Sequence, residues 1–324
     1  MALRVVFLGG AGMIASACAA EAVRAGVDLT VVTRTGGGRW PVPDGARQVR
    51  ADVRDPAALR EALGGADHDV VVDWVGYSPA DVARDVDAYA GRVGQYVFIS
   101  TASVFSRPVP QLPVTESSPR RNNAWPYPKD KLDCETLLEA AYRERDFPVT
   151  IVRPAHVYDR TVVPVLAGWT AVDRMRRGRP AVVHGDGTSL WNLTHSGDFA
   201  RAFVPLLGNQ HALGESVNVT SGEILTWDQI HQALAAAAGA PPRLAHRSSE
   251  TIETEIPNWG PVLRHDFAHS LFFDSTKLLR LVPGFASRVP FSAGAREIIE
   301  WYDADPARKR VDPILDAAFD RLVD

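Results

Sequence analysis

The sequence of 324 residues has few lysines and little net charge. Only four lysines occur, at positions 129, 131, 277 and 309, so nearly all of the 35 basic residues are arginines. The formal net charge of −4 gives no electrostatic reason to expect nucleic acid as a partner, because phosphate binding normally shows as a basic face. No apolar run approaches the roughly 18 residues of a membrane span, and the apolar run at the N-terminus is too short for a signal peptide. We therefore expect neither a membrane nor a nucleic acid as partner.

Cysteine is equally scarce. Cys18 and Cys134 cannot form a disulfide framework, and no Cys/His pattern of zinc-ligand spacing includes them. His265 and His269 are four residues apart, but Asp266 stands where a zinc-protease motif needs glutamate, and no third ligand is apparent. The sequence thus predicts no metal site, and the two thiols indicate buried, reduced cysteines in a cytoplasmic protein.

The first half of the chain alternates short β-branched runs with alanine-rich helical stretches. Because strands that are apolar throughout and separated by helices imply a parallel sheet covered on both faces, this pattern predicts an α/β protein. The expected architecture is a doubly wound parallel sheet of the Rossmann type. The predicted strands are 4–8, 29–33, 48–51, 69–75, 96–100 and 149–153, and the predicted helices are 14–25, 56–63 and 131–145.

After about residue 160 the pattern loosens. Short strands are predicted at 181–184, 216–219 and 243–246, with a capped helix at 226–238 and a final helix from Ala293. The proline-rich stretch 107–119 is predicted to be a surface loop. We expect a dinucleotide-binding domain over 1–160 and a smaller mixed α/β substrate lobe over 161–324, with some segments of the second half returning to the first domain.

A glycine-rich turn follows the first predicted strand. Gly9, Gly12 and Ala15 have the spacing Gly-x-x-Gly-x-x-Ala, with Met13 and Ile14 at the start of the helix. Such glycines let backbone N–H groups approach a pyrophosphate at a helix N-terminus. We therefore assign Gly9, Gly12, Met13 and Ile14 to a dinucleotide site, with an ordinary strand–helix connection as the alternative.

The residues after the second strand bear on the choice of cofactor. Thr33 and Arg34 stand where an NAD site of this type usually has an acid for the ribose 2′-hydroxyl. Arg34 and the loop from Gly36 to Arg39 would accept a 2′-phosphate, which favours NADP over NAD; stacking of Arg34 on adenine without a phosphate preference is the alternative. Asp52 and Val53 follow the third strand and suit the adenine edge, with a solvated loop aspartate as the alternative.

A hydroxyl, a phenol and an amine form the predicted catalytic set. Thr101 follows the fifth strand, and Tyr127 and Lys131 are four residues apart and share one face of a helix. Hydride transfer at a carbinol carbon needs a proton to leave or join the oxygen, and a free phenol with a pKa near 10 is a poor base at neutral pH. A nearby lysine would lower that pKa by about 1–3 units. We assign Tyr127 as acid/base, Lys131 as the group that lowers its pKa, and Thr101 as the partner of the reacting oxygen.

With these motifs the chain resembles the extended short-chain dehydrogenases/reductases, the group that contains nucleotide-sugar epimerases and dehydratases. The resemblance runs from the glycine turn through Tyr127 and Lys131 to residues 152–158, 184–187 and 273–277, and residues 73–77 are similar to an atypical branch of the chloroplast stem-loop-binding type. It implies that Lys131 also holds the nicotinamide ribose, that Trp74, Val75 and Pro154 contact the cofactor, and that the protein is a homodimer.

The sequence departs from the family where substrates are recognised. Family 4,6-dehydratases carry an Asp-Glu pair where this chain has Ala102 and Ser103, so that reaction is disfavoured. Trp191 and Asn192 replace the segment whose arginine grips a diphosphate in the epimerases, although Arg264 or Arg174 would be able to compensate. The asparagine typical of the family has no clear counterpart around residues 78–87, so an altered proton relay is expected.

Four residues are assigned to the substrate: Ser103, His156, Trp191 and Asn192. Trp191 offers a stacking surface for a sugar or aromatic ring, with a core tryptophan as the alternative. His156 is a candidate second acid/base, with a hydrogen-bonded structural histidine as the alternative.

The leading prediction is an NAD(P)-dependent oxidoreductase or epimerase that transfers hydride at a secondary alcohol or ketone of a sugar-like substrate, nucleotide sugars included. The first alternative is an NADPH-dependent ketoreductase of a biosynthetic pathway, suggested by Arg34 and the missing diphosphate arginine. The second is a non-catalytic nucleotide-sensing or RNA-binding protein, suggested by the resemblance to the stem-loop-binding type.

Overall fold

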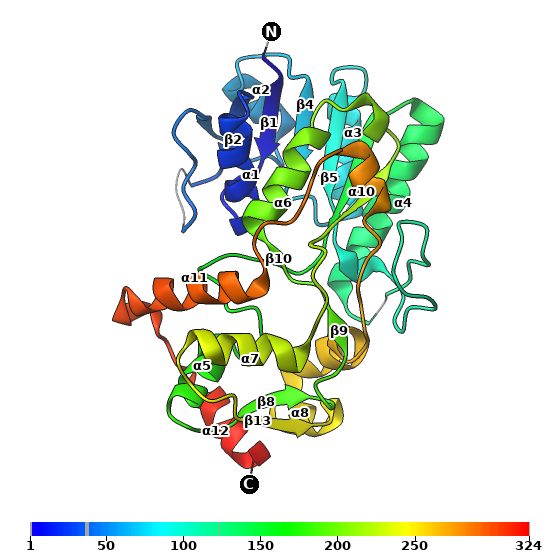
Figure 1. Cartoon of the computed structure of the whole chain (residues 1–324). Helices are drawn as coiled ribbons and strands as arrows, with labels where there is room; N and C mark the ends of the chain where they lie inside the picture. The colour runs from blue at the N-terminus through cyan, green and yellow to red at the C-terminus, as the bar shows by residue number, and fades with distance from the viewer. Residues whose placement is uncertain (1, 36–38, 123, 324) are drawn as a thin grey trace.

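The computed structural model describes residues 2–35, 39–122 and 124–323. Its larger part is built on a parallel sheet of seven strands in the order β11-β6-β5-β4-β1-β2-β3 (Figure 1). Most of these strands are apolar on both sides, because helices cover both faces of the sheet. The strands are β1 Arg4–Leu8, β2 Asp28–Thr33, β3 Arg47–Arg50, β4 Val70–Asp73, β5 Gln95–Ile99, β6 Val149–Pro154 and β11 Ser216–Val219.

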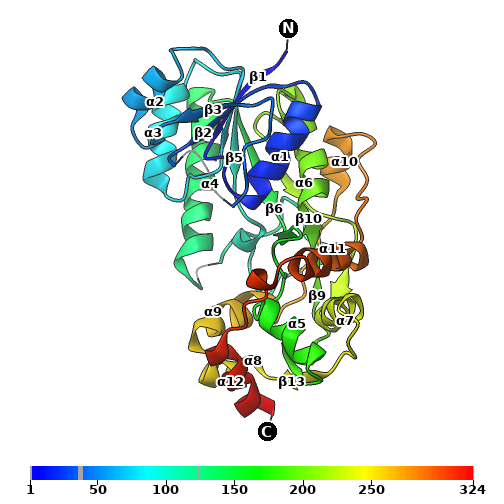
Figure 2. The same cartoon turned by 90° about the vertical axis from the view of Figure 1, so that its left-hand side faces the viewer.

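Helices pack on both faces of this sheet, as Figure 2 shows. Helices α1 (Met13–Arg24) and α6 (Ser196–Phe203) cover one face, where Cys18, Phe199 and the sheet share one apolar cluster. Helices α2 (Pro56–Ala62), α3 (Pro79–Tyr89) and α4 (Pro126–Arg145) cover the other. The predicted doubly wound α/β fold of the Rossmann type is confirmed.

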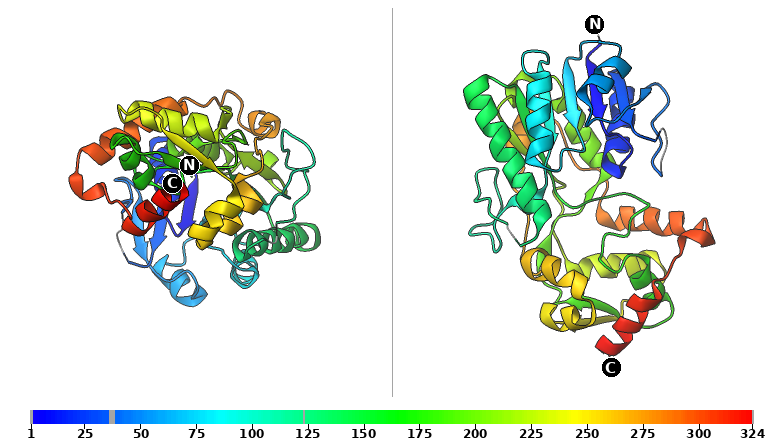
Figure 3. Two further views of the ribbon diagram at one scale, coloured as in Figure 1. Left: turned by 90° about the horizontal axis from the view of Figure 1, so that it is seen from below. Right: turned by 180° about the vertical axis from the view of Figure 1, so that it is seen from behind.

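The smaller part of the protein lies beyond the carboxyl ends of the strands, with the C-terminus far from the N-terminus (Figure 3). Its aromatic and aliphatic core is separate from the two clusters of the sheet. Three strand pairs, β7–β10, β9–β12 and β8–β13, join its segments. The elements are β7 Val157–Tyr158, α5 Trp169–Arg176, β8 Ala181–His184, β9 Leu190–Trp191, β10 Thr194–His195, β12 Leu225–Thr226, α7 Trp227–Ala237, β13 Leu244–Arg247, α8 Ser249–Glu255, α9 Gly260–Val262, α11 Phe291–Asp303 and α12 Pro313–Val323.

Several segments after residue 160 lie against the large sheet. β11 pairs with β6 at its edge, α6 packs on α1, and α10 (Thr276–Leu281) lies beside β11. In the described ranges, no helix is both long enough and apolar enough to cross a membrane.

Two helix predictions need correction. The helix expected from Ala293 begins at Phe291 and is not the final one, since α12 follows it. Helix α3 was not predicted, although its start carries a proline in the first turn and a reciprocal cap between Ser78 and Asp81. The apolar spacing of α3 is weak because buried Asp85 occupies its inner face.

Helix α4 is held to the sheet by a buried ion pair. Arg153 on β6 donates from Nε to Glu135 Oε1 and from Nη2 to Oε2, each at 2.8 Å, and both side chains are almost fully buried. Arg120 donates to the same carboxylate at 2.6 Å. Two-point contacts of this kind fix orientation as well as distance. The pair therefore sets how α4, which carries Tyr127 and Lys131, lies on the sheet.

We expect Glu135→Gln to lower the free energy of unfolding by about 3–5 kcal/mol, because it leaves the buried Arg153 guanidinium without a counter-charge. Asp133→Asn is the control, since Asp133 pairs with Lys129 on the exposed side of the same helix and should cost less than about 1 kcal/mol. Chemical denaturation of the three proteins measures both. Equal effects of the two substitutions would contradict the anchoring role of Glu135.

Candidate active site

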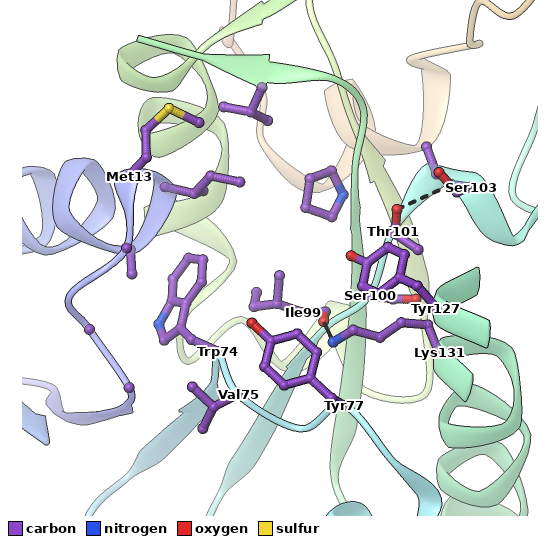
Figure 4. A pocket seen from close by; sticks show the side chains of 18 of the residues that line it. Met13, Trp74, Val75, Tyr77, Ile99, Ser100, Thr101, Ser103, Tyr127 and Lys131 are labelled. Carbon is purple, nitrogen blue, oxygen red and sulfur yellow. Dashed lines mark hydrogen bonds between the residues drawn. The ribbon is translucent and has the colours of Figure 1, made fainter. Parts of the chain in front are cut away.

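A cavity of about 1030 Å³ opens along the carboxyl ends of the strands. It lies where β1 has β2 on one side and β4 on the other, the position at which doubly wound sheets bind ligands. Most residues assigned to a site from the sequence line it: Gly9, Gly12, Met13, Ile14, Thr33, Arg34, Asp52, Val53, Trp74, Val75, Thr101, Ser103, Tyr127, Lys131, Pro154, His156, Trp191 and Asn192. In Figure 4, Met13, Trp74 and Val75 lie across from Thr101, Tyr127 and Lys131.

The glycine turn leaves room for a group at the start of α1. Gly9 has a φ of +79°, and a Cβ there would lie 2.3 Å from Val75 Cγ1. At Gly12, the N-cap of α1, a Cβ would meet nothing within 4 Å, so the space before the helix is open. Open space in front of free helix N–H groups suits a pyrophosphate. The glycine turn therefore fits a dinucleotide.

The end of the cavity near this turn, lined by residues 9–15, 33–35 and 51–54, is called the glycine-turn end. Asp52 is engaged by Arg54, which donates from Nε to Oδ1 at 3.0 Å and from Nη2 to Oδ2 at 2.7 Å. These hydrogen bonds lower the pKa of Asp52, and the charge of Arg34 adds to the effect. Arg34 lines the cavity as an exposed side chain beside this ion pair.

The loop from Gly36 to Arg39 is the other part of the predicted 2′-phosphate site. Gly36, Gly37 and Gly38 lie outside the described residues. Arg39 does not line the cavity: its guanidinium donates to the carbonyl of Thr161 at 2.6 Å and lies over the ring of Trp301. The prediction that Arg39 contributes to a 2′-phosphate site is therefore wrong for this structure, because the side chain is occupied by the smaller lobe.

Lys131 is buried, with 3% of its surface exposed. Its ammonium donates to the carbonyl oxygens of Gly76 at 2.8 Å and Ile99 at 2.7 Å, and it lies over the rings of Tyr77 and Phe98. Burial lowers the pKa of Lys131, while the charge of Asp73 opposes that change. Two of the three N–H bonds are thus used by the main chain, and the third is available to a ligand.

Tyr127 differs from the expectation in one respect. Its side chain is 43% exposed. Partial removal of the phenol from water nevertheless raises its pKa, Tyr77 adds to the increase, and the side chain of Thr101 opposes it. The Lys131 ammonium is bonded to the carbonyl groups of Gly76 and Ile99 and does not contribute to this shift, so the lowering of the phenol pKa by Lys131 stays a prediction. The structure does place the phenol, the Thr101 hydroxyl and the Lys131 side chain on one side of one cavity (Figure 4).

His156 is an uncharged hydrogen-bond acceptor. Trp191 donates from Nε1 to His156 Nδ1 at 3.0 Å, which leaves the histidine proton on Nε2. Phe267 stacks on the imidazole at a centroid distance of 5.8 Å. Burial lowers the pKa of His156 to about 4. This arrangement matches the structural alternative rather than a second acid/base.

Trp191 and Asn192, also assigned to the substrate, make contacts within the protein that use their side chains. Trp191 is 4% exposed and packs against Trp227 and Phe267, so the alternative of a core tryptophan describes it. The Asn192 amide donates to the Glu223 carbonyl and accepts from the Phe273 N–H at 3.2 Å. Both residues line the cavity, and their polar groups are taken by the protein itself.

Sequence reasoning missed several lining residues, among them a group from one late segment: Val262, Asp266, Phe267, Leu271 and Phe273. We call the wall formed by His156, Trp191, Val262, Asp266, Phe267, Leu271 and Phe273 the aromatic end of the cavity. The pattern from His265 to His269 drew attention only for its histidine spacing. Tyr77 lines the cavity as well; residues 73–77 were singled out for their resemblance to the stem-loop-binding type, but Tyr77 was given no role.

Charge is distributed unevenly along the cavity. Its cationic lining residues, Arg34, Arg54, Arg84 and Lys131, precede residue 132, and none of the described lining residues after 150 is lysine or arginine. Arg174 is buried against Asp316 and Asp320, and Arg264 pairs with Glu253. The prediction that either would compensate for a missing diphosphate arginine is wrong, because neither lines the cavity.

A sequence profile of the NAD dependent epimerase/dehydratase family matches residues 5–220. The chain belongs to this family. It is 28% identical over 291 residues to 2′-dehydrokanamycin reductase of Streptomyces kanamyceticus, covering 88% of this chain and 81% of that protein. It is 26% identical to the 41-kDa chloroplast stem-loop binding protein b of Arabidopsis thaliana, over 73% of this chain and 59% of that one.

Solved structures of the same fold extend the comparison. UDP-glucose 4-epimerase of Thermus thermophilus, solved in complex with NAD, superposes with a TM-score of 0.72 at 23% identity over 93% of this chain and 99% of that chain. The prediction of an oxidoreductase or epimerase of the extended short-chain dehydrogenase/reductase type thus agrees with its relatives.

Behind the cavity, this family member has two buried carboxyl groups bridged by a phenol. Tyr96 Oη lies 2.9 Å from Asp73 Oδ2 and 3.0 Å from Asp85 Oδ2. One phenolic proton cannot serve both contacts, so one carboxyl group must carry a proton of its own. Asp73 Oδ1 also accepts from the N–H groups of Val75 and Gly76, which favours its charged form. Burial raises the pKa of Asp73 as well, but these N–H groups and the charge of Lys131 oppose that increase, so we assign the proton to Asp85.

The groups around Asp85 explain its titration. Burial raises the pKa of Asp85 to about 7, the charge of Asp73 adds to the increase, and Arg84 and Tyr96 oppose it. The Gly76 carbonyl, in the turn that Asp73 holds, accepts from Lys131. The pair of carboxyl groups thus shapes the turn that supports the lysine.

We expect Asp85→Asn to remove a pH dependence of stability. The pKa of Asp85 is about 7 in the folded protein and about 4 in an unfolded chain, so its contribution to stability falls as pH rises from 4 to 7 and stays low above that. The asparagine amide donates to Tyr96 in place of the carboxyl proton, so the variant should be more stable than wild type above pH 7, on the order of 2–4 kcal/mol. Denaturant titrations from pH 4.5 to 8 measure this difference.

Asp81→Asn on the same helix is the matched control. Burial raises the pKa of Asp81, but hydrogen bonds from Ser78 and Arg84 outweigh it and lower the pKa. The control should therefore lose stability relative to wild type at neutral pH, with the loss shrinking in acid. A difference in stability between Asp85→Asn and wild type that stays constant over the pH range would contradict a proton on Asp85.

Proposed function

We propose that the protein is an NAD(P)H-dependent reductase of a ketone on a sugar-like ring that carries no nucleoside diphosphate. The observation that carries the proposal is the meeting of the glycine turn, Thr101, Tyr127 and Lys131 in one cavity. Its volume of about 1030 Å³ is at the upper end of the range of ligand sites, which leaves space for a cofactor and a substrate together.

Each catalytic side chain has a task that its contacts support. Tyr127 donates its phenolic proton to the carbonyl oxygen of the substrate, and Thr101, which lines the same cavity, holds that oxygen. Lys131 directs its remaining N–H to the ribose of the cofactor that is attached to the nicotinamide ring. When bound, the reduced nicotinamide supplies the hydride.

The uneven charge favours net reduction of a ketone over epimerisation of a nucleotide sugar. A diphosphate carries at least two negative charges and is normally gripped by arginine or lysine. The described lining of the aromatic end has neither. The relative from Streptomyces kanamyceticus is a reductase by name, which supports this choice.

Arg34 supports a preference for NADP. It lines the glycine-turn end, where the acidic side chain nearest to it, Asp52, is already paired with Arg54. A 2′-phosphate would therefore meet a positive side chain and no free carboxylate. A cytoplasmic location, a homodimer and the alternative RNA-binding role remain predictions.

We expect Tyr127→Phe to lower kcat for a ketone substrate at least 100-fold, because the proton donor is removed, while cofactor binding is kept. Tyr142→Phe is the matched control, since Tyr142 is a partly exposed tyrosine on the same helix. Oxidation of NADPH followed by absorbance, together with a cofactor titration by fluorescence, measures both properties. Equal rates for wild type and Tyr127→Phe would refute the proposed function.

We expect the wild-type protein to bind NADPH at least tenfold more tightly than NADH, and Arg34→Ala to abolish that difference, as befits a charge-assisted contact. Arg24→Ala serves as the control, because Arg24 is an exposed arginine on α1 paired with Glu21. Calorimetric titrations with both cofactors provide the comparison. Tighter binding of NADH by the wild type would overturn the NADP assignment.

A further inference from the structure

Asp266 is an acidic lining residue of the aromatic end to which the proposed function gives no task. It lies on a π-helical turn, Leu263–Phe267, a rare element that often marks functional sites. The side chain is 4% exposed, lines the aromatic end, and comes from a segment more than 150 residues after Ser103. In the lining of that end it is the acidic residue, among rings and aliphatic groups.

An arginine behind the cavity wall holds this carboxyl group in place. Arg107 lies with Nε 3.0 Å and Nη2 2.8 Å from Asp266 Oδ1, and both side chains are nearly fully buried. Arg107 also donates to the carbonyls of Phe105 and Ser106, which fixes it to the loop after Ser103. Since the guanidinium does not line the cavity, it engages Oδ1 from behind and leaves Oδ2 for other partners.

Ser103 uses that second oxygen. Its hydroxyl donates to Asp266 Oδ2 at 3.3 Å, so the lone pairs of Ser103 Oγ remain free to accept a hydrogen bond. The Ser103 N–H donates to Thr101 Oγ1 at 3.2 Å, a contact drawn in Figure 4. Ser103 therefore stands directly beside the hydroxyl that the proposed function places on the reacting oxygen.

We propose that Ser103 and Asp266 form a specificity site for a hydrogen-bond donor, a hydroxyl or a protonated amine, on the carbon next to the reacting carbonyl. The inference rests on the proposed function only for the position of that carbonyl. Ser103 Oγ and Asp266 Oδ2 are both hydrogen-bond acceptors, so they suit a donor group of the substrate. The negative charge of Asp266 would repel a phosphate or carboxylate group in the same place. The rings of Phe267 and Phe273 would cover the rest of such a ring-shaped substrate.

The test is a binding titration, which needs no turnover. The full-length protein, saturated with the oxidised cofactor that the titrations of the previous section select, is titrated with cyclohexanol, 1,2-cyclohexanediol and 2-aminocyclohexanol, the last two as cis and trans isomers. We expect at least one diol or amino alcohol to bind about tenfold more tightly than cyclohexanol. This is the effect expected for one additional hydrogen bond to a charged carboxylate. A stronger preference for the amine that weakens with salt would identify the donor as an ammonium group.

Ser103→Ala and Asp266→Asn should each reduce this preference to within about twofold while leaving the affinity for cyclohexanol unchanged. Ser103→Ala keeps the ion pair with Arg107, so it remains informative if Asp266→Asn is unstable. Asp316→Asn is the matched control, because it weakens a carboxylate–arginine pair with Arg174 outside the cavity, and it should keep the preference.

Equal binding of the three compounds, no binding of any, or an unchanged preference in Ser103→Ala would overturn the specificity site. The proposed function fails separately. If the wild type prefers the diol or amino alcohol but oxidises no alcohol and reduces no ketone, the catalytic proposal is refuted and the specificity site stands.

Discussion

The buried ammonium of Lys131 is the interaction on which the arrangement of the site depends. Its hydrogen bonds to the carbonyls of Gly76 and Ile99 join the first turns of α4 to the carboxyl ends of β4 and β5. Because Tyr127 lies one turn earlier on the same helix, these bonds also place the phenol beside Thr101, which follows β5. The buried Glu135–Arg153 pair holds the remainder of the helix on the sheet.

The supports of this ammonium extend behind the cavity. Asp73 holds the turn that presents the Gly76 carbonyl, and Tyr96 and Asp85 hold Asp73. A buried carboxylate is costly unless hydrogen bonds and charges compensate it, which explains why this cluster has two backbone donors, a phenol and a nearby lysine. The shape of the cavity at the lysine is thus linked to the protonation of Asp85, which is joined to Asp73 through the Tyr96 phenol.

The two ends of the cavity have different chemistry because they come from different parts of the fold. The domain built on the sheet supplies the glycine turn and the cationic lining residues. Both features suit a cofactor that carries phosphate groups. The smaller lobe supplies rings and aliphatic side chains, with Asp266 as its acidic group. One cavity therefore has a cationic lining at the end formed by the sheet domain and an aromatic lining without lysine or arginine at the other, within the described residues.

The sheet domain was largely predictable, since its signals are local: apolar runs for β1, β4 and β5, the glycine spacing before α1, and the four-residue interval between Tyr127 and Lys131. Helix α3 escaped because a buried Asp85 interrupts its apolar face, although the cap of Ser78 and Asp81 marks its start. Arg39, Arg174 and Arg264 were misjudged for another reason. A sequence shows that an arginine is available, but not which carboxylate or carbonyl occupies it.

By itself, the sequence determined the fold, the family and the glycine turn, Thr101, Tyr127 and Lys131 of the cavity, because strand periodicity, glycine spacing and helical intervals act over a few residues. Only the tertiary structure decided what those side chains do. It bonded the Lys131 ammonium to two carbonyls instead of aiming it at the phenol, made His156 an acceptor for Trp191, and brought Asp266 to Ser103. Hydrogen-bond partners and burial control protonation, and both are set by segments that meet only when the chain has folded.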